Sequence, residues 1–204
     1  EMVVHSLARD AGINTAVATA QRFSNKHHTF LSQRFDRNQA GNRIHFASAM
    51  TLLGHTDGQN HTEGVSYLDL VEFITEHGAK VQEDLEQLWR RIVFSICVSN
   101  VDDHLRNHGF LLTNKGWCLS PAYDINPVET GTGLNLNISS DDNALDLDLA
   151  MDVIPYFRFN EDRATVIIKE IKAAVLNWRT LAKKLSISNG EIELKSKAFQ
   201  QAMI

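Results

Sequence analysis

Apolar residues recur every three or four positions in the middle of the chain, a spacing that places them on one side of an α-helix. The run contains no glycine or proline, and the residues on this stripe are Leu85, Leu88, Trp89, Ile92, Val93, Ile96 and Cys97. So continuous a stripe predicts a buried helix. A chain of 204 residues, 43% of them hydrophobic, can build a core around it as one domain or one large lobe.

Capping signals predict other helices around this one. Ser66 with Asp69 is a capping box, and Gly78 would end the helix that it opens. Ser188 with Glu191 predicts the start of a last helix in the same way. The other expected helices cover residues 1–11, 46–53 and 164–185, the last as one long amphipathic helix.

Strands are expected to be few and short. Residues 16–23 and 29–35 look like strands, and Phe110–Thr113 with Trp117–Leu119 predicts a hairpin that turns at Asn114-Lys115-Gly116. Residues 129–150 are rich in Gly, Asn, Ser and Asp and are expected to be irregular. The predicted fold class is therefore α+β and mostly helical.

Composition excludes some classes of partner. The net charge of -5 and the pI of about 6.0 leave no basic surface for direct nucleic-acid binding. No apolar run approaches the roughly 18 residues that cross a membrane. The two cysteines, Cys97 and Cys118, stand far apart and outside any CxxC pair, so we expect buried, reduced thiols and a cytoplasmic protein.

A polar segment between the buried helix and the hairpin carries the candidate chemistry. Asp102 is followed five positions later by Asn107, and Asp124 comes soon after the hairpin. A carboxylate such as Asp102 can orient a hydroxyl and accept its proton, while an amide oxygen and a second carboxylate suit magnesium. The hairpin would return the chain so that its two flanking loops lie side by side. This order of residues is the one that protein kinases use for phosphoryl transfer.

Three motifs make the resemblance specific. Asp102–Asn107 and Ala122–Asp124 resemble the signature of HipA-type kinases, and Arg34–Arg37 resembles the Arg-Phe-Asp-Arg segment of that family. The similarity runs from Glu1 to about Pro127. It implies a HipA-like serine/threonine protein kinase, the toxin of a type II toxin–antitoxin system, with a kinase-like C-terminal lobe as its fold.

The resemblance also implies a role for each matching residue. Asp102 would be the catalytic base, and Asn107 and Asp124 would bind magnesium (Mg2+). ATP would contact backbone groups of Gln33 and Phe35 at adenine, Asp36 at the ribose, His104 near the phosphates, and Tyr123. Residues 1–37 would end the small lobe and form the hinge, and residues 38–204 would form the helical lobe, with the catalytic segment at 100–127.

The glycine-rich phosphate loop and the phosphate-binding lysine of the family have no match in this sequence. Neither Lys26 nor Lys80 lies on a strand before the first helix, so neither replaces that lysine. Because transfer requires the phosphates to be clamped, we expect these 204 residues to be a fragment that is inactive alone.

The partners that the resemblance implies are a protein substrate, such as an aminoacyl-tRNA synthetase, and a small DNA-binding antitoxin. Two other functions stay open. One is a non-catalytic kinase-lobe interaction module. The other is a metal-dependent hydrolase built on Asp102, Asp103, His104 and His108. In the kinase interpretation Asp103 is expected to be a solvated or supporting carboxylate.

Overall fold

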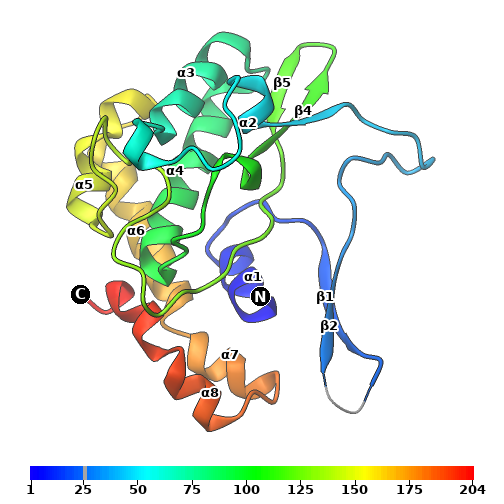
Figure 1. Cartoon of the computed structure of the whole chain (residues 1–204), viewed down its shortest axis with the longest axis vertical. Helices are drawn as coiled ribbons and strands as arrows, with labels where there is room; N and C mark the ends of the chain where they lie inside the picture. The colour runs from blue at the N-terminus through cyan, green and yellow to red at the C-terminus, as the bar shows by residue number, and fades with distance from the viewer. Residues whose placement is uncertain (25–26) are drawn as a thin grey trace.

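The core is built around one helix, α4 (Val81–Val98), as the apolar stripe predicts. The computed structural model describes residues 1–24 and 27–204, and every residue of α4 from Leu88 to Val98 is buried. Helices α3 (Tyr67–His77), α5 (Leu147–Asp152) and α6 (Glu161–Val175) surround it (Figure 1). The 3-10 segments η3 (Ile154–Phe157) and η4 (Ser196–Ala202) complete this shell.

The predicted helix caps are present. The Ser66 side chain accepts from the first turn of α3, the Asp69 carboxylate returns to the Ser66 N–H, and the helix ends at Gly78. Ser188 and Glu191 form the same reciprocal pair at the start of α8 (Asn189–Leu194). Each cap satisfies backbone N–H groups that a helix leaves without partners at its first turn.

The predicted long helix over residues 164–185 is wrong in one respect, because the structure has two helices there. Helix α6 ends at Val175 and α7 (Trp178–Lys184) follows after a turn at Leu176 and Asn177. The turn lets the Trp178 ring stack flat on Phe199, with ring centroids 4.3 Å apart. The apolar spacing continues across the turn, so periodicity alone does not reveal it.

The β-hairpin is confirmed as β4 (Gly109–Thr113) and β5 (Gly116–Leu119), but a third strand joins it. Residues 46–53, expected to be helical, divide into β3 (Phe46–Ser48), which pairs antiparallel with β4, and the short helix α2 (Ala49–Leu52). The reason lies at Gly109, where a Cβ atom would stand 2.2 Å from the Phe46 ring. The missing side chain leaves room for that ring, and the pairing follows.

The N-terminal elements lie on one side of this body. Helix α1 (Met2–Asp10) packs its buried face against α6 and α7, and the chain leaves it through Gly12, whose φ is +75°. Strands β1 (Ala18–Arg22) and β2 (His28–Ser32) pair antiparallel along one side of the molecule, where the Phe30 ring of β2 contacts His5 of α1 (Figure 1). Lys26, considered above as a phosphate-binding lysine, is outside the described residues. The structure combines helices and short strands, with helices predominating, as expected.

Both cysteines carry free thiols; Cys97 is buried and Cys118 partly so. Burial raises the pKa of the Cys97 thiol to about 12. Across residues 1–24 and 27–204, none of the helices combines the length and the apolar character that a membrane span needs.

Candidate active site

The segment that carries the predicted base begins where α4 ends. Ser99, in the left-handed conformation at φ 49°, closes the helix and turns the chain into the loop from Asn100 to Asn107. The Asn100 side chain fixes both sides of this turn, because its Nδ2 donates to the Ser95 hydroxyl and its Oδ1 accepts from the Asn126 N–H. The loop before the hairpin is thereby tied to the loop after it.

Asp103 anchors the loop in the protein interior. It is 4% exposed, it accepts a hydrogen bond from the Tyr67 hydroxyl at 2.6 Å, and one of its oxygens lies 3.1 Å from His108 Nε2. Burial raises the pKa of this carboxyl, but the charges of His108 and Arg91 and the hydrogen bonds outweigh burial and lower it. Asp103 is therefore a supporting carboxylate and not a solvated one.

Asp102 lies on the opposite side of the backbone and is exposed. Its carbonyl accepts hydrogen bonds from the His104 N–H at 3.0 Å and from Asn107 Nδ2 at 3.1 Å. Its carboxylate forms no hydrogen bond or ion pair with another described residue. The backbone is held while the carboxylate stays available, which is the arrangement that a general base requires.

Asn107 and Asp124, the predicted metal ligands, come together although 17 positions separate them. Asn107 Nδ2 lies 3.5 Å from the Asp124 carbonyl, so the amide nitrogen faces two carbonyls and leaves Oδ1 as the atom for a cation. Asp124 is exposed, has φ 55°, and accepts from Asn126 Nδ2 at 3.0 Å. One amide oxygen and one carboxylate are hard donors that fit Mg2+ with phosphate oxygens completing its shell.

Two buried charged residues on α4 hold the end of the hairpin, and the sequence reasoning missed both. Asp84 accepts from the Leu119 N–H at 2.9 Å, and Arg91 donates to the Ser120 carbonyl at 2.5 Å. Burial raises the pKa of Asp84, and burial lowers the pKa of Arg91 to about 10. Their spacing of seven residues, two helical turns, is the signal that could have found them. Through these contacts α4 sets where the chain enters the segment leading to Asp124.

An aromatic cluster joins the predicted hinge to this segment. The Phe35 ring lies 5.6 Å from Tyr123 and 5.8 Å from Phe46, between ring centroids. The Tyr123 hydroxyl donates to the Arg106 carbonyl at 2.6 Å, and burial raises the pKa of Tyr123 to about 12. The structure thus brings Phe35 and Tyr123 together beside Asp124. Phe46, which completes the cluster, was not among the predicted residues.

Within the described part of the chain, the backbone at the predicted hinge leaves unpaired the two groups that the predicted adenine contact uses. The Gln33 N–H donates to the Val17 carbonyl, whereas the Gln33 carbonyl and the Phe35 N–H have no backbone partner among the described residues. The Asp36 carboxylate lies between Arg34, at 2.5 Å, and Arg37, at 2.6 Å. The hydrogen bond from Arg34, with a further one from Arg37, holds the pKa of Asp36 well below its usual range although partial burial opposes them. A ribose contact for Asp36 stays a prediction.

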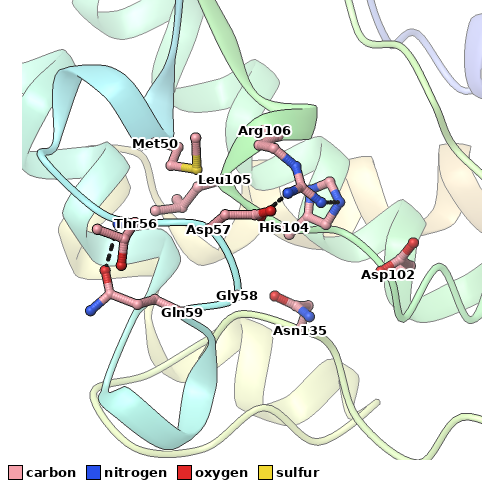
Figure 2. A pocket seen from close by; sticks show the side chains of 10 residues that line it. All are labelled: Met50, Thr56, Asp57, Gly58, Gln59, Asp102, His104, Leu105, Arg106 and Asn135. Carbon is pink, nitrogen blue, oxygen red and sulfur yellow. Dashed lines mark hydrogen bonds and ion pairs between the residues drawn. The ribbon is translucent and has the colours of Figure 1, made fainter.

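His104 faces a cavity of about 220 Å³ next to Asp102 (Figure 2). Its Nε2 lies 3.0 Å from Arg106 Nη2, and Arg106 also forms an ion pair with Asp57. His108 is 2% exposed and contacts Asp103 and Tyr67 in the interior. The side chains of His104 and His108 therefore lie in different surroundings. The described part of the chain holds no cluster of three His, Cys, Asp or Glu side chains arranged for a metal ion. This geometry does not support the hydrolase.

Lys80 does not reach the site. It precedes the first residue of α4 without a capping hydrogen bond from its side chain, and its ammonium lies 3.0 Å from Glu83 at the surface.

Comparison with known proteins finds relatives in sequence and in fold. A family model described as "HipA-like C-terminal domain" matches residues 1–178. A Haemophilus influenzae protein named "Putative kinase" is 27% identical over 128 residues, which cover 60% of this chain and 37% of that protein.

Two solved structures share the fold. HipA of Shewanella oneidensis MR-1, solved with HipB and its operator DNA, has a TM-score of 0.75 at 18% identity. The match covers 99% of this chain and 53% of that chain. The proinflammatory kinase CtkA of Helicobacter pylori has a TM-score of 0.55 at 13% identity, covering 98% of this chain and 85% of that one. The chain thus spans about half of the HipA structure and carries a kinase-like C-terminal lobe.

Proposed function

Because the chain belongs to the family of HipA-like C-terminal domains, we propose that it supplies the catalytic lobe of an ATP-dependent serine/threonine protein kinase. The observation that carries the proposal is the position of Asn107, whose amide faces the carbonyls of both Asp102 and Asp124. A base and two magnesium ligands are needed at one point for phosphoryl transfer, and one side chain here links all three residues.

Each residue has one role in this proposal. The Asp102 carboxylate orients the substrate hydroxyl and accepts its proton. Asn107 Oδ1 and the Asp124 carboxylate hold Mg2+, which when bound offsets the negative charge of the phosphates. The Gln33 carbonyl accepts a hydrogen bond from adenine, and the Phe35 N–H donates one to it. The Phe35 and Tyr123 rings form an apolar surface beside the adenine ring.

The phosphate clamp is the part that this sequence does not supply. We propose that residues encoded before Glu1 provide the glycine-rich loop and its lysine, and that the 204 residues alone transfer phosphate poorly or not at all. Transfer of the γ-phosphate from radiolabelled ATP should be measured with the chain alone and with the upstream residues attached. Strong transfer by the chain alone would disprove the dependence on a separate clamp.

The catalytic assignment is tested in the longer form. Asp102→Asn removes the base while keeping the shape of the side chain, so transfer should fall by about 10²–10⁴-fold. Asp162→Asn, an exposed carboxylate of the α6 first turn, is the matched control and should keep full activity. Full transfer by Asp102→Asn would refute the assignment.

The proposed partners follow from relatives. The Shewanella HipA structure contains HipB and operator DNA, which supports a small DNA-binding antitoxin as partner here. The net charge of -5 of these 204 residues disfavours direct DNA contact, so the proposal assigns DNA contact to that antitoxin. An aminoacyl-tRNA synthetase as substrate and a cytoplasmic location belong to the same proposal.

A non-catalytic interaction module is the second candidate, since the clamp has no match in this sequence. Calorimetry with ATP and Mg2+ on the longer form separates the two, because only the kinase needs to bind nucleotide.

A further inference from the structure

A cavity of about 220 Å³ is lined in part by Asp102 and His104, and the roles assigned above leave its other walls unused. One wall is the loop after α2, which carries Asp57, another is the catalytic loop, and a third is the segment at Asn135 (Figure 2). Because Asp102 is one of the residues that line the cavity, a hydroxyl held at its carboxylate would lie at the cavity. The residues next to that hydroxyl in a substrate chain would therefore lie at the cavity.

An ion pair joins two walls of the cavity, and a cation from another molecule could replace its positive member. Arg106 contacts Asp57 through one guanidinium nitrogen and His104 through another, as Figure 2 shows. The Asp57 side chain is 72% exposed and that of Arg106 is 45% exposed. Ion pairs so exposed contribute little to stability, so a cation from another molecule could take the place of Arg106 at small cost.

Two polar atoms of residues that line the cavity have no hydrogen-bond partner in the part of the chain that the structure describes. An arginine only donates, so His104 Nε2 is the acceptor of their contact and the proton of the neutral ring is on Nδ1. That Nδ1 and Asn135 Oδ1 are both buried without a hydrogen bond. Both atoms are covered in this structure, so a ligand reaches this donor and this acceptor only where the wall moves aside. A peptide unit of an extended chain can satisfy one donor and one acceptor of this kind.

The charges of the lining favour a basic ligand. With His104 neutral, Arg106 balances one of the two carboxylates, Asp57 and Asp102, and one negative charge is left over. A lysine or arginine entering the cavity would gain a partner in Asp57, whereas a glutamate would be repelled.

We propose that this cavity receives the polypeptide segment next to the acceptor serine or threonine, and that Asp57 selects a lysine or arginine there by exchanging Arg106 for it. The free donor of His104 and the free acceptor of Asn135 then pair with the substrate backbone as the wall opens. The inference rests on the proposed kinase function and names the substrate class of that site.

Binding of short peptides to the 204-residue chain tests the inference without any need for catalysis. The probes are fluorescein-labelled hexapeptides with a central serine, in which a single neighbour, before or after the serine, is arginine, glutamate or alanine. At one of the two positions, either before or after the serine, the arginine peptide should bind at least tenfold more tightly than the glutamate peptide. Fluorescence anisotropy measures the two affinities. Asp57→Lys should reverse that order.

Asp162→Lys makes the same change of charge at an exposed site on α6 and should leave the order unchanged. Equal binding of the arginine and glutamate peptides, or an order that Asp57→Lys does not alter, would overturn the inference. So would an equal effect of Asp162→Lys, because the selectivity would then come from net charge. These results stand apart from the catalytic assignment, which fails only if Asp102→Asn retains phosphoryl transfer.

Discussion

The side-chain amide of Asn107 donates to the backbone carbonyl of Asp102 at 3.1 Å, so one contact ties the proposed base to a proposed metal ligand. The donor is the amide nitrogen Nδ2, whereas Mg2+ would bind the amide oxygen Oδ1 of the same side chain. The two tasks of Asn107 can therefore be separated by a substitution that keeps one and removes the other.

Asn107→Asp keeps an oxygen for the metal but removes the N–H donor. In the longer form of the protein we expect Mg2+-dependent nucleotide binding to persist while phosphoryl transfer falls about 10²-fold, because the loop that holds Asp102 is no longer fixed. Calorimetry and transfer assays measure the two quantities. An equal loss of both would mean that Asn107 acts through the metal alone.

Asp124, a proposed metal ligand, also carries backbone strain. Its φ of 55° lies in the left-handed region, which a glycine adopts without the steric cost that a side chain brings. Asp124→Gly should therefore abolish transfer and leave the free energy of unfolding unchanged or higher by about 1 kcal/mol. Urea unfolding measures the change, with Asp124→Ala as the comparison, which we expect to be the less stable of the two variants. A lower free energy of unfolding for Asp124→Gly than for the wild type would contradict backbone strain at this residue.

The hydroxyl of Tyr67 is a support for the catalytic loop. It is fully buried and donates to Asp103 at 2.6 Å, so Tyr67→Phe leaves a buried carboxylate with one donor fewer. We expect a loss of about 1–3 kcal/mol in unfolding free energy. Tyr156→Phe, at an exposed tyrosine of η3, is the control and should be neutral. A neutral Tyr67→Phe would show that His108 and the Ser95 hydroxyl satisfy Asp103 without Tyr67.

Some of these supports could be predicted from the sequence and others could not. The capping box at Ser66 and the apolar stripe of α4 are local patterns, and the structure confirms both. The contacts of Asp84 and Arg91 with the hairpin join residues about 30 positions apart, and no local pattern encodes that distance. The short strand at Phe46 depends on Gly109 in the same way.

The order of the candidate site residues was readable, because Asp102, Asn107 and Asp124 sit in a motif. Their environment was not. Nothing in the neighbouring pair Asp102 and Asp103 says which carboxylate points outward; that depends on Tyr67 and His108, which reach only one of them.

The buried carboxylates should make stability depend on pH in opposite ways. The pKa of Asp103 is lowered on folding, so the unfolded chain binds this proton more tightly than the folded chain does. The stability that Asp103 contributes is therefore present above its unfolded pKa of about 3.9 and is lost as the pH falls below that value. The pKa of Asp84 is raised by burial, so its contribution to stability falls as the pH rises through this range. We expect Asp103→Asn to differ most from the wild type near pH 6 and less toward pH 3, in urea unfolding.

Asp84→Asn is the control for that series, because its stability relative to the wild type should improve as the pH rises from 3 to 6. Parallel curves for both variants would show that the pH dependence arises at other carboxyls.

Gly109 is where the fold of β3 and the candidate site meet, since it seats the Phe46 ring that contacts Phe35 and Tyr123. Gly109→Ala would place a Cβ atom 2.2 Å from that ring and force it to move. We expect a loss of about 1–3 kcal/mol from overpacking, together with weaker ATP binding by the longer form. Gly190→Ala is the matched control, because a Cβ there meets nothing within 4 Å and the residue lies in α8, where alanine should stabilise by roughly 0.5–1 kcal/mol. If Gly109→Ala lost stability but bound ATP as the wild type does, the aromatic cluster would be part of the fold and not of the nucleotide site.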